Sequence, residues 1–454
     1  MASAESRVAT PRRAGGDASP TQQSAWVRAG ARFVVALLIV ASTAMAVVAA
    51  PAATFSNPIV EAAPGTGSAD PSVVLFRGYY YYCRALGDRA IGVARARRLQ
   101  DIGAAPMVTV FRPGPDTDHG RELWAPELQR IRGRWYIYFA ASDGVNAHHR
   151  MYALQAESDD PQGRYVLKGR VSDDSDRWAI DGVALELHGK LYFVWSGWPE
   201  ATGDFPQVLY IAAMRDPWTI AGRRHLIAAP EHAWERAVAA VLEGPEPIVH
   251  RGRMHLVYSA GASWSDDYSL GLLTYRGGNP LHASSWRKQP LPVFAKNAAA
   301  RAFGVGHASF VRSPDGKEDW IVYHATDRPG AGWRARSVRA QHFRWSYDGR
   351  PEFGRPVEIG RPLEAPSGTP GASVATAPAR SRAATAGGRQ PRLRRNTSSR
   401  LLAGMSTRRS NARPARSDSA MTSARRRRPQ AGFRSRRSAS KAALPGAVGS
   451  PSTR

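Results

Sequence analysis

The sequence has almost no cysteine: Cys83 is the only one in 454 residues, so no disulfide can form within the chain. Its last ninety residues contain one aromatic residue, Phe433, and one acid, Asp418. Between residues 70 and 364 no segment shows a sustained helical period. These absences exclude a disulfide-stabilised scaffold, a folded C-terminal domain and a helical core. Stability therefore has to come from a large β-rich core.

The basic charge is concentrated at the two ends of the chain. Residues 365–454 contain 20 Lys and Arg against one acid, and residues 1–32 contain five Arg against two acids, whereas the whole chain carries +26. By subtraction, residues 33–364 have a net charge of about +4. The high pI is therefore a property of the ends, and nucleic acid is not an expected partner of the folded part.

Composition divides the chain into four parts. An uncharged apolar run at 33–50 follows Arg28 and Arg32 and precedes small residues, an order typical of a secretory signal peptide. Eighteen residues also suffice for an uncleaved membrane anchor facing outward. We expect secretion, and membrane attachment only if the run is uncleaved. The expected parts are a signal peptide or anchor (1–53), a linker (54–68), a folded domain (69–364) and a disordered Arg- and Ser-rich tail (365–454).

The tail allows two interpretations. Its arginines, including the run 425–428, are suited to tether the protein to an anionic wall polymer or to nucleic acid. Alternatively the tail is dispensable, or is a misread frame in a high-GC gene.

A β-hairpin unit recurs five times in the central part, and residues 178–198 are its clearest copy. Each copy combines an apolar strand, a turn with glycine and an aromatic strand. The turn glycines stand at 78, 133, 189, 252 and 316, so they are 55, 56, 63 and 64 residues apart, and each interval leaves room for two more strands. Four short strands per repeat are typical of a propeller blade. We predict an all-β, five-bladed β-propeller with disordered N- and C-terminal extensions; a β-sandwich would not explain the repeated register.

A polar residue stands at the entrance of the first strand in every copy. These residues are Asp70, Glu127, Asp181, Glu243 and His307. Because the first strand of each blade lines the axis, we expect the five side chains to converge on one funnel. Neighbouring carboxylates drive their pKa values apart, so one pocket can hold a general acid and a general base. A separation of about 6.5 to 9.5 Å suits inverting glycoside hydrolysis, and about 5 to 5.5 Å a retaining one.

Six short motifs follow one another along these copies: Ala-Asp-Pro (69–71), Trp-Ala-Pro-Glu (124–127), Trp-Ala-Ile-Asp-Gly (178–182), Glu-Gly-Pro (243–245), Gly-His (306–307) and Ser-Val-Arg-Ala-Gln (337–341). Together they resemble glycoside hydrolase family 43, over about residues 70 to 364. The resemblance implies a five-bladed propeller that inverts the anomeric centre of arabinofuranosides and xylosides. Val241-Leu242 and Ala308 depart from the usual motifs and concern details of the pocket.

The resemblance also implies roles for individual residues. Asp70 is expected to be the general base, Glu243 the general acid, and Asp181 the third carboxylate, which orients the acid and keeps its pKa high. Glu246 is a rival acid. Glu127 is expected on the pocket floor, among the substrate-binding residues, without a role in proton transfer.

Three further residues have two interpretations each. His307 is either a packed histidine or, as the resemblance implies, a partner of a structural calcium ion on the axis. Trp124 either stacks on a sugar ring or packs between blades. Arg339 either binds substrate hydroxyls or a catalytic carboxylate, or is a surface arginine.

The predicted function is that of an inverting glycoside hydrolase releasing terminal α-L-arabinofuranosyl residues from arabinan or arabinoxylan of plant cell walls. Residues 135–139 and 146–152 most resemble the α-L-arabinofuranosidases of the family. The alternatives are a β-xylosidase or endo-arabinanase of the same family, or a non-catalytic carbohydrate-binding propeller. No cofactor is expected for the chemistry, and the protein is expected to be a monomer.

Overall fold

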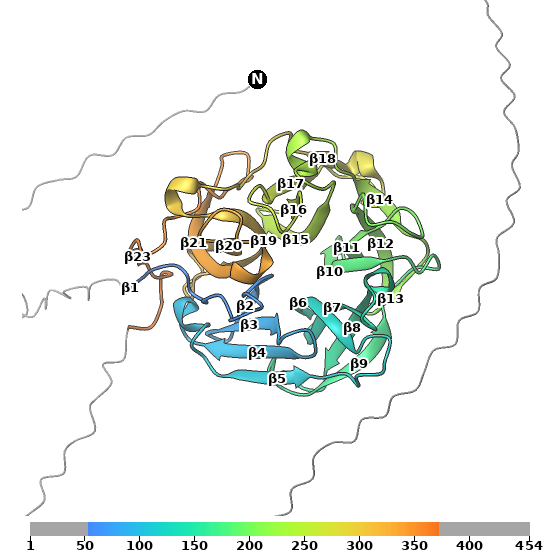
Figure 1. Cartoon of the computed structure of the whole chain (residues 1–454), viewed down its shortest axis with the longest axis horizontal. Coiled ribbons are helices and arrows are strands. Elements are labelled where there is room, and N and C mark those ends of the chain that lie inside the picture. The colour runs from blue at the N-terminus through green and yellow to red at the C-terminus, as the bar shows by residue number, and fades with distance from the viewer. Residues whose placement is uncertain (1–52, 372–454) are drawn as a thin grey trace, which may run out of the picture. The chain divides into compact units, whose positions relative to one another are not determined.

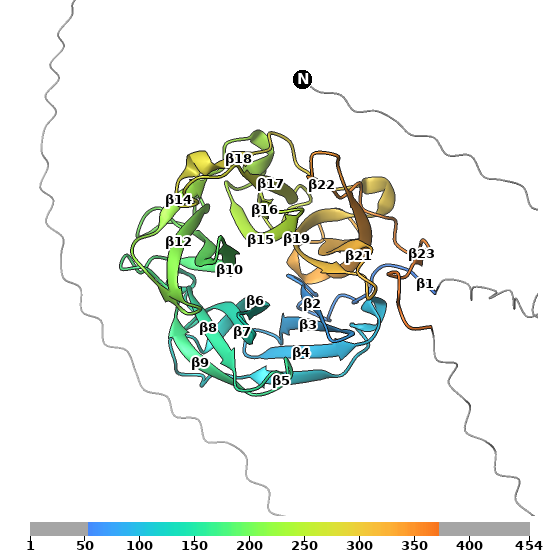
Figure 2. The same ribbon diagram turned by 180° about the vertical axis from the view of Figure 1, so that it is seen from behind.

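The computed structural model describes residues 53–371 of the 454. Five antiparallel sheets surround a central axis, as Figure 1 and the reverse view in Figure 2 show. The prediction of an all-β, five-bladed propeller is confirmed. The predicted signal peptide or anchor at 33–50 and the tail beyond residue 371 lie outside the described residues. None of the helices within 53–371 is long and apolar enough to cross a membrane.

Each blade is a sheet whose first three strands follow chain order outward from the axis. Blade one consists of β2 (Ser72–Phe76), β3 (Tyr79–Ala85), β4 (Ile91–Ala96) and β5 (Met107–Phe111). Blade two consists of β6 (Arg121–Ile131), β7 (Arg134–Ser142), β8 (Arg150–Ala156) and β9 (Tyr165–Arg170). Blade three consists of β10 (Ala179–Leu187), β11 (Lys190–Gly197), β12 (Val208–Asp216), β13 (Thr219–Ile220) and β14 (His225–Ala228).

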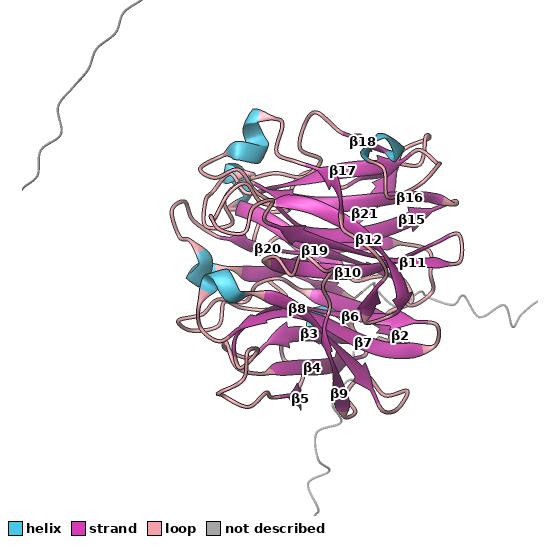
Figure 3. Ribbon diagram, turned by 90° about the vertical axis from the view of Figure 1, so that its right-hand side faces the viewer, coloured by secondary structure: helices cyan, strands magenta, loops and turns pink. Residues whose placement is uncertain are grey.

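Blades four and five complete the ring. Blade four consists of β15 (Leu242–His250), β16 (Arg253–Ala260), β17 (Ser269–Tyr275) and β18 (Trp286–Lys288). Blade five consists of β19 (Phe303–Arg312), β20 (Asp319–Thr326), β21 (Ser337–Trp345) and β22 (Pro351–Glu352). Six short 3₁₀ helices lie in loops between the strands (Figure 3): η1 (Leu99–Asp101), η2 (Asn146–His148), η3 (Ala233–Arg236), η4 (Ala283–Ser285), η5 (Ala298–Ala300) and η6 (Trp333–Ala335).

The turn glycines lie between the two inner strands of each blade, as their spacing predicted. In four blades the two inner strands are joined by two residues that both have positive φ: Arg77-Gly78, Arg132-Gly133, His188-Gly189 and Arg251-Gly252. Two consecutive positive φ values define the tight hairpin turn whose twist matches that of the flanking strands, and glycine adopts them without strain. In blade five the loop is longer, and Gly316 is its positive-φ residue.

The apolar core lies between the blades. Five large clusters of buried residues each join two neighbouring blades, so every interface of the ring has its own cluster. Figure 1 shows the five sheets fanned around the centre in this order. Because each sheet buries both of its faces against neighbours, the inner strands are apolar on both sides. This packing holds the inner strands, and the side chains at their ends, in fixed positions.

The expected linker at 54–68 is part of the folded domain. The strand β1 (Thr54–Phe55) pairs with β23 (Leu363–Glu364), beside blade five in Figure 1. Ile59 and Val60 are buried and contact β21, and the side chain of Asn57 exchanges two hydrogen bonds with the backbone of Ala340. The prediction was wrong because a few apolar residues among Ala, Pro and Gly are enough to dock this segment. At the other end Ser367 donates its N–H to Glu318, so contacts continue past residue 364.

Candidate active site

Each blade has a residue in the left-handed region at a corresponding position, just before or near the start of its inner strand. These residues are Asp70 (φ 47°), Ala125 (φ 40°), Asp181 (φ 53°), Gly244 (φ 54°) and His307 (φ 35°). They stand eight residues before the turn glycine in blades one to four and nine before it in blade five. In blades two to five the strand pairing shifts at this point, which marks a β-bulge. A bulge redirects a side chain, and such strained backbone is typical of functional sites.

Two of the five predicted entrance residues do not occupy this repeated position. Glu243 precedes the bulge residue Gly244 by one, and Glu127 follows the bulge residue Ala125 by two. Glu246 follows Gly244 by two and is therefore the counterpart of Glu127 in blade four. Because residues two apart lie on the same face of a strand, Glu127 and Glu246 are placed further along the axis than the entrance.

A cavity of about 690 Å³ is lined by residues from all five blades, and it holds most of the predicted site. Asp70, Trp124, Asp181, Glu243 and His307 all line it. Glu127 and Arg339 do not line this cavity, so the structure does not support their prediction as substrate-binding residues. The rival acid Glu246 lines a different cavity of about 290 Å³, between the inner strands.

Asp70 is surrounded by positive charge. Its Oδ1 lies 3.6 Å from Nη1 of Arg336, 3.6 Å from Nδ1 of His307 and 3.3 Å from Nδ1 of His324. Burial alone would raise the pKa of Asp70, but the charges of Arg336 and His307 outweigh it and hold that pKa well below its usual range. The carboxylate is therefore ionised at any moderate pH and available to accept a proton.

Glu243 has the opposite character. Its burial, and then the negative charge of Asp181, raise its pKa to about 8, while the hydrogen bond from the Tyr268 hydroxyl to Oε1 at 2.8 Å opposes the rise. Burial also raises the pKa of Asp181, to about 6, against the effect of His307. At neutral pH Glu243 is protonated and can donate a proton, whereas Asp181 is mostly ionised.

His307 is held as a cation at the bottom of this cavity. Burial would lower its pKa, but Asp70, Glu127 and Asp181 together raise it to about 10. Its Nε2 lies 2.9 Å from Glu127, and its Nδ1 lies 3.8 Å from Asp181. Glu127 is 2% exposed and contacts the ring of His307. The counterpart Glu246 approaches it, and burial together with the charge of Glu127 raises the pKa of Glu246 well above its usual range.

The residues around His307 do not fit the expected calcium ion. Both ring nitrogens face carboxylates of the protein, and a protonated ring has no lone pair to offer a metal. Within residues 53–371 no group of three or more His, Cys, Asp or Glu side chains is arranged to hold a metal ion. The imidazolium supplies the positive charge at this point of the axis.

Arg339 is buried away from the cavity. Its Nη2 donates to the backbone carbonyls of Arg301 and Thr326, which places the guanidinium between blade-five loops. Arg336, three residues earlier, lines the cavity and faces Asp70. The Ser-Val-Arg-Ala-Gln motif therefore pointed to the right region, but the arginine that faces Asp70 directly precedes the motif, in the loop before β21.

Trp124 lies against His149, with ring centroids 3.8 Å apart and planes 24° apart. Two further tryptophans of the cavity, Trp178 and Trp198, stack on each other at 4.6 Å. The Nε1 of Trp178 and the Nδ1 of His149 both bond the carbonyl oxygen of Asn146, at 2.9 and 3.0 Å. The aromatic wall on this side is thus tied to the loop between β7 and β8.

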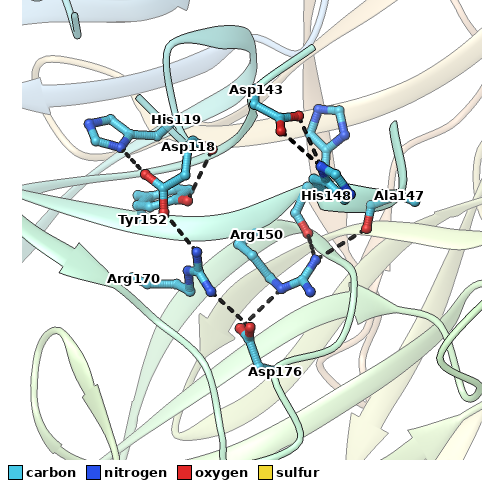
Figure 4. A network of polar contacts seen from close by, with 10 residues as sticks. Asp118, His119, Asp143, Ala147, His148, Arg150, Tyr152, Arg170 and Asp176 are labelled. Carbon is cyan, nitrogen blue, oxygen red and sulfur yellow. Dashed lines mark hydrogen bonds and ion pairs between the residues drawn. The ribbon is translucent and has the colours of Figure 1, made fainter. Parts of the chain in front are cut away.

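A polar network braces that loop from outside (Figure 4). Arg150 donates to the carbonyl oxygens of Ala147 and His149 and pairs with Asp176, whose carboxylate also pairs with Arg170. Arg170 continues to Asp118, as Figure 4 shows. These pairs are partly exposed, so each contributes little free energy of folding, and their effect is to hold the loop in one conformation.

Several residues that line the cavity were not predicted as site residues from the sequence. They are Arg84, Asn146, Trp178, Trp198, Phe205, Trp264, Trp333 and Arg336, with Tyr268 behind Glu243. Most stand in loops at the same end of the blades, so they share no period. One signal was present: Trp178 belongs to the same short motif as Asp181.

Comparison with known proteins gives consistent matches. Residues 55–351 match the model for "Glycosyl hydrolases family 43". An "Extracellular exo-alpha-(1->5)-L-arabinofuranosidase" of Streptomyces avermitilis is 35% identical over 69% of this chain and 66% of its own length. "Alpha-L-arabinofuranosidase 43" of Humicola insolens is 33% identical over 72% and 68%. The chain thus spans about two thirds of the length of these relatives. The crystal structure of an α-L-arabinofuranosidase from Lactobacillus brevis superposes with a TM-score of 0.63 at 33% identity, over 68% of this chain and 98% of that one.

Proposed function

Since the chain belongs to glycoside hydrolase family 43, as its motifs indicated, we propose that it is an exported, inverting exo-α-L-arabinofuranosidase. The enzyme would release terminal α-L-arabinofuranosyl residues from arabinan or arabinoxylan. Hydrolysis in this family needs no cofactor. The names of the relatives support the choice of sugar, and the relative from Streptomyces avermitilis is described as extracellular, which supports export.

The observation that carries the proposal is the opposite protonation of two carboxyl groups in one cavity. Asp70 has a pKa well below its usual range, and Glu243 has a pKa of about 8, so at neutral pH one is a base and the other an acid. Glycoside hydrolysis with inversion requires this pair, because water must lose a proton on one side of the sugar while the leaving oxygen gains one on the other.

The proposed reaction uses the two groups in one step. Asp70 accepts a proton from water, whose oxygen forms a bond to the anomeric carbon. The bond from that carbon to the leaving oxygen breaks, and this oxygen takes the proton of Glu243. The products are free arabinose and a shortened saccharide. Asp70 is then protonated and Glu243 ionised, and exchange with solvent restores both.

Asp181 has a supporting role in this proposal. Its carboxylate contributes to the raised pKa of Glu243, so that the acid keeps its proton at neutral pH. His307 is a positioning residue: it lies within 4 Å of both Asp70 and Asp181 and neutralises part of their mutual repulsion. Trp124 would face the bound sugar from the wall of the cavity.

The proposal is tested by assaying the full-length protein on an aryl α-L-arabinofuranoside and an aryl β-D-xyloside. We expect the arabinofuranoside to be hydrolysed in clear preference. Proton NMR during the reaction should show β-arabinofuranose as the first product, since the mechanism inverts the anomeric centre. A preference for the xyloside would assign the alternative substrate, and sugar binding without turnover would contradict catalysis.

A further inference from the structure

Three aromatic side chains stand exposed at the rim of the active-site cavity. Phe205, Trp264 and Trp333 are 49%, 39% and 50% exposed, whereas the other three tryptophans of the cavity wall are buried or half-buried. They belong to three different loops, between β11 and β12, β16 and β17, and β20 and β21. Exposed large aromatics gathered at the mouth of a pocket point to a binding surface, because exposing them to water is unfavourable.

Trp264 and Trp333 form a fixed corner. Their ring centroids are 5.4 Å apart and their planes are inclined by 74°. The Nε1 of Trp333 donates to the hydroxyl of Ser263 at 3.0 Å, and the carboxylate of Asp266 accepts the N–H of Gly330 at 2.9 Å. These two bonds join the loops that carry the tryptophans. The corner is therefore preorganised, and binding there requires little ordering.

One tryptophan of the corner is linked to the general acid through its loop. Trp264 belongs to blade four, whose inner strand carries Glu243, and the same loop ends at Tyr268, which donates to Glu243. Trp333 belongs to the loop that carries Arg336, the partner of Asp70. Because Glu243 has to protonate the leaving oxygen, the sugar that bears this oxygen must lie next to Glu243 and outside the arabinose site.

The size and chemistry of the cavity agree with a second sugar. Its volume of about 690 Å³ falls within the roughly 300 to 1,000 Å³ that sites for drug-sized ligands occupy, and exceeds what one pentose needs. A sugar ring presents C–H groups on its faces and hydroxyls at its edge, which suits an indole that is flat, apolar and exposed. Neither tryptophan nor the sugar is charged, so this contact does not depend on salt.

We propose that the Trp264–Trp333 corner binds the sugar of the leaving group, so that the enzyme prefers arabinosides linked to another neutral sugar. This inference rests on the proposed function. It assigns the two tryptophans to leaving-group recognition and not to the arabinose that is cleaved off.

Two substrates separate the two sites. α-L-Arabinofuranosyl fluoride places only arabinose in the cavity, whereas (1→5)-α-L-arabinobiose also has a leaving sugar. In full-length Trp264→Ala and Trp333→Ala we expect kcat/KM for arabinobiose to fall about tenfold or more, as truncating a central tryptophan contact does. For the fluoride we expect less than about a threefold change, which also shows that the variants are folded. Trp264→Phe should retain most of the arabinobiose activity.

Tyr347→Ala is the matched control, because this tyrosine is fully exposed and does not line the cavity. This substitution should leave kcat/KM unchanged for both substrates. Equal losses of activity on both substrates in the tryptophan variants would overturn the inference, since the corner would then shape the arabinose site. The absence of any loss on either substrate would overturn it as well. Failure of the wild-type protein to hydrolyse both substrates would instead contradict the proposed function.

Discussion

Gly244 donates its backbone N–H to Oδ2 of Asp181 at a distance of 3.0 Å. The bond joins blades three and four directly beside Glu243, the residue before Gly244. Glycine suits this position, because its φ is 54° and a Cβ atom would lie only 3.1 Å from Nδ1 of His307. The spacing of Asp181 and Glu243 is thereby fixed, and the pKa of Glu243 is the property that substitutions around it should shift.

Replacing Glu243 by Gln removes the acid and keeps the size of the side chain. We expect kcat/KM on an aryl arabinofuranoside to fall by about 10² to 10⁴, the usual contribution of general acid–base catalysis. Glu246→Gln is the matched control. Burial raises the pKa of Glu246 well above its usual range, and the residue lines the other cavity, so activity should change by a few-fold at most. A loss of activity in Glu246→Gln but not in Glu243→Gln would identify Glu246 as the general acid.

Asp181→Asn should move the alkaline limb of the pH profile of kcat/KM to lower pH. The negative charge of Asp181 helps to raise the pKa of Glu243 to about 8, and asparagine removes it while still accepting the N–H of Gly244. Below about pH 6 the wild-type Asp181 is itself protonated, so wild type and variant should converge there. An unchanged alkaline limb would show that another group sets it.

Tyr268→Phe should shift the same limb in the other direction. The Tyr268 hydroxyl donates to Glu243 and stabilises its ionised form, so losing the bond raises the pKa of Glu243 above about 8. Activity should then persist to higher pH, measured on the same substrate as for Asp181→Asn. Shifts of the same sign in both variants would contradict the assignment of Glu243 as the group that titrates.

The fold was predictable because the turn glycines repeat, and the cavity carboxylates Asp70, Asp181 and Glu243 were found through the short motifs. Counting back eight residues from the turn glycine also places Asp70 and Asp181 at the positive-φ position, and counting back six places Glu127 and Glu246 together. Aligning the copies by their acids missed this, since a bulge shifts the register by a residue that no hydropathy pattern records.

Contacts made by loops were not predictable in the same way. Arg336 faces Asp70 and Tyr268 donates to Glu243 from loops of unequal length, and such loops carry no period. The docking of Asn57 on Ala340 joins segments nearly 300 residues apart through two hydrogen bonds. Single polar contacts over such separations depend on the closed ring, and not on a local pattern.

Arg336→Gln should move the acidic limb of the pH profile to higher pH. Arg336 is the strongest of the positive charges that hold the pKa of Asp70 well below its usual range, and glutamine has no charge. Asp70 would then be protonated, and inactive as a base, at a higher pH than in the wild type. Arg336→Lys keeps the charge and should restore much of the original limb. A fall in activity with an unchanged acidic limb would mean that Arg336 binds substrate only.

His307→Gln should destabilise the fold in a pH-dependent way. Removing one partner of a buried ion pair costs about 3 to 5 kcal/mol, because Glu127 is left buried without its cation. The folded state raises the pKa of His307 from 6.5 to about 10, so its contribution is complete below pH 6.5 and is lost as the pH rises through 10. Urea unfolding of the full-length protein at several pH values should therefore show the largest difference in unfolding free energy between wild type and variant below pH 6.5, shrinking toward pH 10.

His342→Gln, at an exposed position of blade five, is the control and should show no such trend. A difference that does not vary with pH would mean that His307 is neutral in the folded protein.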